Sequence, residues 1–412
     1  MMIPGLDSAL AASPLRYGDE LYPRQHIAFR ATRPSGSNRP AVQIDGDLSK
    51  SFWEEVPWTE DFVDIATETS PKFRTRAKIR WDENFLYIGT PSSASNKSMT
   101  VKGVERLGYS KISPELSDRG GAYLEETDVW GTLTKHNSVI FHDNDFEVFV
   151  STDATNHNYK EFEVNCLNCT WSLLLNKPYA ESGSEDSKRI DPENGYDMEP
   201  GLISAVKVYP DEINNPSVKN SHWTVEVAMP MQKLMERNPD AKQPDDGVLW
   251  RINFSRVQWS FGVDEDNKYV KKACCQSCRI PGAEAEDNWV WSKQGEVAMH
   301  LPERWGILQF SNEMPSTEVK LKYYEEWPVR CAAMGLFYAM KEYQSSESLY
   351  TDDLKALAAY SIKPFTICNE AATSIMLTDD GYEARVSLGQ FTATINHERY
   401  LVVERDIDTA LS

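Results

Sequence analysis

Three segments of the chain alternate polar and apolar residues, and their polar positions hold side chains suited to binding a ligand. These positions are Glu147 within residues 145–150, Glu163 within residues 161–166, and Arg251 and Asn253 within residues 251–255. Successive side chains of a β-strand point to opposite faces, so burial of the apolar residues places the polar ones on one surface. Carboxylate, amide and guanidinium groups pair with sugar hydroxyls. We therefore expect a hydroxyl-binding surface; the alternative is a solvated sheet face on which Glu and Arg pair across strands.

Two carboxylates on one surface also allow an enzymatic interpretation. Glycoside hydrolases use two carboxyl groups about 5–10 Å apart, one of which has a raised pKa. Glu147 with Glu163 or Glu161 would form such a pair. The pattern indicates an open sheet face rather than a cleft that excludes water. We therefore expect binding, with hydrolysis of O-glycosyl bonds as the alternative.

Two C-x2-C pairs each have the form of half a zinc site. They are Cys166 with Cys169 and Cys275 with Cys278. Residues three apart on a strand point to opposite faces, which favours buried free thiols over zinc.

Histidine and aspartate residues gather in a second region with metal-binding side chains. They are His136, His142, Asp143, Asp145, Asp153 and His157. A metal ion at these residues would be calcium rather than zinc, because oxygen ligands dominate. A solvated acidic loop is the simpler interpretation, and we expect no cofactor. The sequence has no Gly-rich phosphate loop, G-x-S-x-G elbow or H-E-x-x-H motif.

The elements that would position these residues are mostly β-strands. Period-2 runs separated by polar turns extend from residue 41 to about residue 312 and predict an antiparallel β-sandwich. Residues 1–40 lack a period and are expected to be a loose lead-in, and residues 90–120 a disordered insert. Residues 315–412 are expected to form a small α+β extension, with helices at 319–343 and 354–360 and a hairpin formed by 384–395 and 399–403.

Composition limits the partners of this 412-residue chain. With 43 Lys and Arg against 63 Asp and Glu, its formal charge is −20, which argues against nucleic acid. No apolar run approaches the about 18 residues of a membrane span. Its 12 Trp, 18 Tyr and 15 Phe raise the expectation of rings that stack on a ligand.

The sequence gives two indications of cellular location. Residues 1–21 show no secretory signal, and seven cysteines in a chain of this length favour a reducing compartment. A cytoplasmic protein is therefore the default, and a secreted one follows if the start of the chain is misassigned.

Seven segments, taken in order, resemble family-9 carbohydrate-binding modules over roughly residues 41–312. The segments are VQIDGDLSKSFW (42–53), AKIRWDENFLYI (77–88), HDNDFEVFVS (142–151), YKEFEVN (159–165), WTVEVAMP (223–230), WRINFSRV (250–257) and PERWGILQF (302–310). The resemblance implies a β-sandwich that binds oligosaccharides or polysaccharides without catalysis and is typically attached to enzymes of polysaccharide catabolism.

The resemblance also implies particular site residues. The family's characterised members clamp the sugar between two Trp rings, whose places here fall on His142 and Met299. Its polar positions correspond to Glu147, Glu163, Arg251 and Asn253; Glu147 matches, whereas Glu163 replaces a basic residue. Loss of both clamp rings weakens the expectation of strong end-on binding. A different aromatic platform would come from Phe141, Trp130, Trp291 and Trp305, each of which also fits a core position.

The sequence thus predicts a non-catalytic carbohydrate-binding protein. The alternatives are a glycoside hydrolase that uses Glu147 and Glu163, and a degenerate sandwich that binds another protein.

Overall fold

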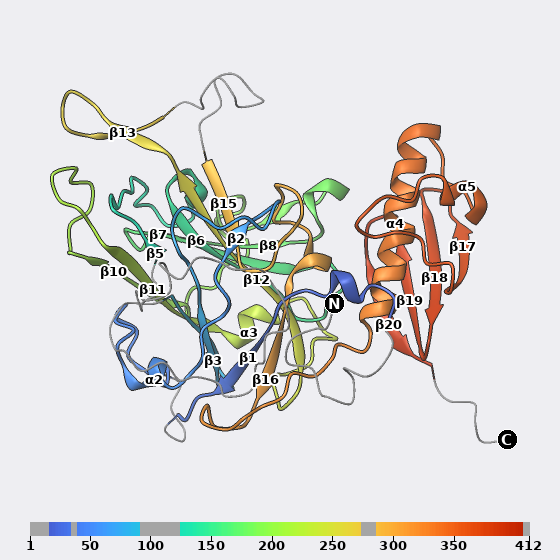
Figure 1. Ribbon diagram of the computed structural model, residues 1–412, viewed down its shortest axis with the longest axis horizontal. Helices are drawn as coiled ribbons and strands as arrows, with labels where there is room; N and C mark the ends of the chain where they lie inside the picture. The colour runs from blue at the N-terminus through green and yellow to red at the C-terminus, as the bar shows by residue number, and fades with distance from the viewer. Residues whose placement is uncertain (1–15, 34–38, 91–123, 273–285, 407–412) are drawn as a thin grey trace, which may run out of the picture.

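The computed structural model describes residues 16–33, 39–90, 124–272 and 286–406. Figure 1 shows a large β-structure with a smaller α/β unit beside it. Residues 91–120 of the expected insert, and both cysteines of the second C-x2-C pair, lie outside the described residues. No helix within the described ranges is long and apolar enough to cross a membrane.

One continuous sheet dominates the described residues. Its strands are β1 (Gln25–Arg30), β2 (Val63–Asp64), β3 (Lys78–Trp81), β4 (Phe85–Gly89), β5 (Leu124–Glu125), β6 (Asp145–Ser151), β7 (Tyr159–Asn165), β8 (Thr170–Leu175), β9 (Glu185–Asp186), β10 (Ile203–Tyr209), β11 (His222–Pro230), β12 (Leu249–Trp259), β15 (Glu286–Val290) and β16 (Gly306–Ser311). The main order is β10-β11-β4-β3-β1-β16-β12-β6-β7-β8-β9. Short elements connect these strands: η1 (Asp19–Leu21), α2 (Ser51–Glu54), η3 (Ile140–His142), η4 (Tyr179–Glu181), α3 (Met231–Leu234), the hairpin β13 (Phe261–Val263) and β14 (Tyr269–Lys271), and η5 (Pro302–Arg304).

The two halves of this sheet pack against each other around one apolar core. Strands β3, β4 and β11 contribute Ile79, Leu86 and Val227, among others, and strands β6, β7 and β12 contribute residues such as Val148 and Phe254. Two facing layers with a shared apolar interior constitute a sandwich. The predicted mainly-β sandwich is therefore confirmed.

Strand β1 lies in the middle of the sheet, which corrects the expectation that residues 1–40 are a loose lead-in. It pairs in parallel with β16, where Gln25 faces Ile307, and with β3, where Phe29 faces Arg80. The burial along β1 does not follow a strict alternation, and its pairing partners are distant in sequence. A local period-2 pattern therefore could not reveal this strand.

The carboxyl-terminal residues form a four-stranded antiparallel sheet of β17 (Ala372–Leu377), β18 (Tyr382–Leu388), β19 (Phe391–Asn396) and β20 (Leu401–Arg405). Helix α4 (Trp327–Glu347) packs on this sheet with the shorter α5 (Leu354–Ala358), and together they enclose a separate apolar core. The expected helix at 319–343 begins later, at Trp327. Pro328 explains the shift, because proline is favoured in the first helical turn, where no backbone donor is lost.

Candidate functional site

Strands β6, β7, β8 and β12 present one outer face, and their register brings predicted residues together. Glu147 lies opposite Glu163 on β7 and opposite Ser255 on β12. Glu161 lies opposite Phe149, and Glu163 lies opposite Trp171 on β8. Because directly opposite side chains in a sheet are neighbours, Glu147 and Glu163 share one patch with Trp171.

A cavity of about 340 Å³ opens over this patch. Its walls combine carboxyl groups, aromatic rings and loop residues. They are Ile65, Phe141, Glu147, Phe149, Glu161, Glu163, Trp171, Tyr179, Val257, Glu286, Asn288, Val297, Ala298, Met299 and His300. Phe141 and Tyr179 are exposed, so their rings are accessible to a ligand that enters.

The carboxyl groups in and beside the cavity are buried close to one another. Burial raises the pKa of Glu147 to about 7. Burial together with the charge of Glu147 raises the pKa values of Asp145, Glu161 and Glu163 well above their ordinary range. Two carboxyl pairs, Asp145 with Glu147 and Glu161 with Glu163, are close enough to share a proton.

These buried carboxyl groups predict a pH-dependent stability. The pKa of Glu147 is raised from 4.5 to about 7, so the folded state binds a proton that the unfolded state releases, and the stabilisation is complete only below pH 4.5. From Glu147 alone, we expect the free energy of unfolding to fall by about 3 kcal/mol as the pH rises through this range. Urea unfolding at several pH values measures this loss, and Glu147→Gln should remove that share of it. A wild-type profile no steeper than that of Glu147→Gln would contradict the assignment.

Few donors serve these carboxyl groups. The backbone N–H of Phe141 donates to Glu163 Oε2 over 3.0 Å, and that of Val257 donates to Asp145 Oδ1 over 3.0 Å. His300 Nδ1 lies 3.0 Å from the Tyr159 hydroxyl, and burial lowers the pKa of His300 to about 4. His300 is therefore neutral at pH 7 and does not balance the acidic side chains.

One donor in the cavity wall lacks an acceptor. Trp171 is only 5% exposed, and its indole Nε1 makes no hydrogen bond. A buried polar group without a partner is costly. An oxygen atom of a bound molecule would satisfy this donor.

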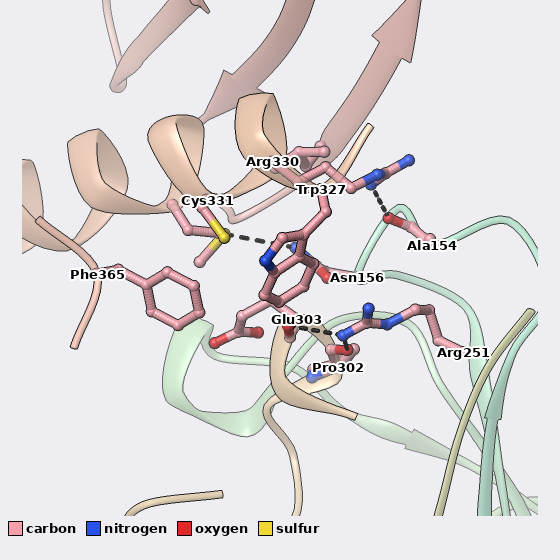
Figure 2. A pocket seen from close by; sticks show the side chains of 11 residues that line it. Ala154, Asn156, Arg251, Pro302, Glu303, Trp327, Arg330, Cys331 and Phe365 are labelled. Carbon is pink, nitrogen blue, oxygen red and sulfur yellow. Dashed lines mark hydrogen bonds between the residues drawn. The ribbon is translucent and has the colours of Figure 1, made fainter. Parts of the chain in front are cut away.

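Arg251 lies on the same outer face but does not reach the cavity, which corrects its predicted role. The α/β unit covers it: Figure 2 shows Trp327 of α4 beside Arg251, and the guanidinium group lies 5.3 Å from that ring. Arg251 Nη2 donates to the backbone oxygen of Glu303 over 2.7 Å. Arg251 is only 4% exposed, so it joins the two parts of the chain.

Three other predicted site residues serve packing, which corrects their predicted role. Asn253 is buried and exchanges two hydrogen bonds of 2.8 Å with the backbone of Ser292. The Trp291 indole donates to Glu60, and the Trp305 indole donates to the backbone of Met299. Both rings are fully buried, and neither lines the cavity.

Met299 lines the cavity, whereas exposed His142 stands outside the lining and packs its ring against Phe141. Sequence reasoning missed Trp171, Tyr179 and His300 as lining residues. Trp171 lies in a regular strand that had not been singled out, and the other two lie in connecting segments. No local pattern indicated that those segments fold over the sheet.

The residues predicted as possible metal ligands have other roles in the structure. His136 bonds to Asp197 over 2.9 Å, and Asp143 accepts hydrogen bonds from the backbone of Thr132 and Leu133. These groups therefore already have partners. Cys166 and Cys169 are buried free thiols, and zinc binding with the second pair stays a prediction.

Comparisons with known proteins give weak matches. No protein-family model and no curated protein matches the sequence. A solved structure from Bacteroides uniformis, described as a candidate carbohydrate-binding protein, matches at 13% identity and a TM-score of 0.42, covering 70% of this chain and 99% of that chain. A family-9 carbohydrate-binding module from Caldicellulosiruptor kristjanssonii with cellotriose matches at 12% identity and a TM-score of 0.35, covering 73% and 100% of the two chains. Its complex with glucose matches at 12% identity, 72% and 100% coverage and a TM-score of 0.35. These TM-scores lie below 0.5, so the function has to be inferred from the cavity itself.

Proposed function

We propose that the protein binds a carbohydrate, without catalysis, in the cavity over β6, β7 and β8. The observation that carries this proposal is the combination of acidic acceptors, the buried unpartnered Trp171 donor and exposed rings around one space of about 340 Å³. Ligand cavities typically measure roughly 300–1,000 Å³, so this one fits a small sugar or the end of a longer glycan.

Each part of the wall has a function in this proposal. The carboxyl groups of Glu147, Glu161 and Glu163 accept hydrogen bonds from sugar hydroxyls, and Trp171 donates one. Phe141 and Tyr179 provide flat apolar surfaces at the opening, against which the C–H faces of a sugar ring pack. In this proposal, smaller rings at other positions do the work of the two clamp Trp rings of the resembled family, which this sequence lacks.

Titration calorimetry with gluco- and xylo-oligosaccharides tests the proposal. Glucose and cellotriose, the ligands of the compared modules, are suitable first probes. We expect saturable binding that Glu147→Gln weakens about tenfold, because a hydrogen bond to a charged group contributes about 1.5–3 kcal/mol and 1.4 kcal/mol corresponds to tenfold. Tyr179→Ala should also weaken the binding, because it removes a ring against which the sugar packs.

The control is Glu383→Gln on β18. Unlike Glu147, Glu383 is exposed, and it belongs to the carboxyl-terminal sheet, so the substitution should leave the affinity unchanged. An equal loss in all three variants, or no saturable response to any glycan, would overturn the proposal and favour the protein-binding alternative.

Hydrolysis is the second candidate, favoured by the raised pKa values of the enclosed carboxyl groups. A carboxyl group that stays protonated near neutral pH is what a general acid requires. Chromatography of the oligosaccharide after incubation separates the two functions. Binding alone leaves the glycan intact, whereas shortened products that disappear in Glu147→Gln would establish an enzyme.

A further inference from the structure

Three acidic side chains at the cavity form a compact group of oxygen atoms. Asp145, Glu147 and Glu163 each offer one carboxylate oxygen, and these three atoms all lie within 4.8 Å of one another. Asp145 and Glu147 belong to β6, and Glu163 belongs to β7, directly opposite Glu147. The hydrogen-bonded strand pair therefore fixes the backbone positions from which the three side chains converge.

No lysine or arginine side chain balances this group among the described residues that line the cavity, which include four glutamates. The lining histidine, His300, has its Nε2 4.0 Å from Glu161, and burial lowers the pKa of His300 to about 4.

A second observation points to a ligand. The fully buried Asp145 uses Oδ1 to accept from the Val257 backbone, while its other oxygen, Oδ2, receives no hydrogen bond from a described N–H or hydroxyl group. A buried carboxylate oxygen without a donor is costly unless a proton or a cation occupies the space beside it.

We infer that Asp145, Glu147 and Glu163 bind one divalent cation of the calcium type, and that hydroxyl groups of the carbohydrate complete its coordination. The second half of this inference rests on the proposed function; the cation site does not.

The ligand set selects the class of metal. Calcium takes six to eight oxygen ligands at roughly 2.3–2.6 Å, so two oxygens that bind one ion lie at most about 5 Å apart. The three carboxylate oxygens, all within 4.8 Å of one another, meet this limit. All three side chains are carboxylates, which disfavours zinc and copper at this site. Glu147 and Glu163 line the open cavity, so the positions that the protein leaves free face the space where the sugar would enter. Vicinal hydroxyls are hard oxygen ligands of the kind that calcium accepts.

Calorimetry with calcium chloride alone tests the cation site. The full-length protein is first treated with a chelator and then dialysed, and magnesium chloride serves as a comparison. We expect one calcium ion to bind each chain, and Glu163→Gln to weaken this binding at least tenfold. Glu383→Gln is the matched control, because Glu383 is exposed on β18 in the carboxyl-terminal sheet and should change the affinity less than twofold.

The wild-type titration decides the question even if a variant does not fold. No calcium binding by the wild type, or the same loss in Glu383→Gln as in Glu163→Gln, would overturn the cation site. Titration of cellotriose with calcium and with chelator then tests the link to carbohydrate, and we expect at least tenfold weaker binding without calcium. Equal glycan affinity in both buffers would overturn the coordination of the sugar while supporting the proposed function. Calcium binding without any glycan binding would support the cation site and contradict the proposed function.

Discussion

Replacing Arg399 with glutamine is expected to lower the free energy of unfolding by about 3 kcal/mol, because loss of one partner from a buried ion pair is strongly destabilising even where Lys341 remains beside Glu181. Arg399 is 1% exposed in the turn between β19 and β20. Its guanidinium group bonds to Glu181 of η4 and lies 3.5 Å from Glu303 of η5. Burial alone would lower the pKa of Arg399, but these carboxylates and Tyr338 raise it overall.

Urea unfolding of the wild type and Arg399→Gln measures this loss. Arg385→Gln on β18 is the matched control, since Arg385 is exposed in the same small sheet and should change stability by less than about 0.5 kcal/mol. Similar unfolding curves for Arg399→Gln and the control would show that Glu181 and Glu303 do not depend on this arginine.

Replacing Trp327 with alanine is expected to cost a similar amount, about 3–5 kcal/mol, for a different reason. Trp327 is the first residue of α4, and its ring packs edge-to-face with Tyr22 and lies over Arg251. Its indole N–H donates to the backbone oxygen of Gly18 over 2.7 Å. Truncation therefore leaves a cavity where three parts of the chain meet, and the cost of such cavities in buried Trp→Ala variants is in this range.

Trp327→Phe separates packing from hydrogen bonding. It retains an aromatic ring but loses the bond to Gly18, so we expect a smaller loss of about 1–2 kcal/mol in the same urea experiment. Equal losses in the two variants would mean that the hydrogen bond, rather than the packing of the ring, stabilises this junction.

Alternation along the strands predicted the outer face correctly but not what covers it. The register places Glu147, Glu163, Arg251 and Asn253 on one side of β6, β7 and β12, as expected. The two-residue period shows which side chains of a strand share a face. It contains no information about a helix some 80 residues later in the chain. Arg251 was therefore assigned to a ligand surface although α4 lies over it.

The abundance of aromatic residues was also misleading as a sign of ligand binding. Six tryptophans, including Trp291 and Trp305, are among the largest fully buried side chains. Those two satisfy their indole N–H groups within the protein. Trp171 differs because it lines the cavity and its indole nitrogen has no hydrogen-bond partner. Neither property can be predicted before the surrounding chain is in place.

The place of β1 in the sheet has a consequence for the order in which the molecule assembles. Its first residues pair with β16, about 280 positions later in the chain, so a ribosome releases the strand long before its main partner exists. Pairing across such a separation slows folding. Until β16 has been made, the sheet has an open gap between β1 and β12. The sandwich therefore closes only after residue 311 has emerged.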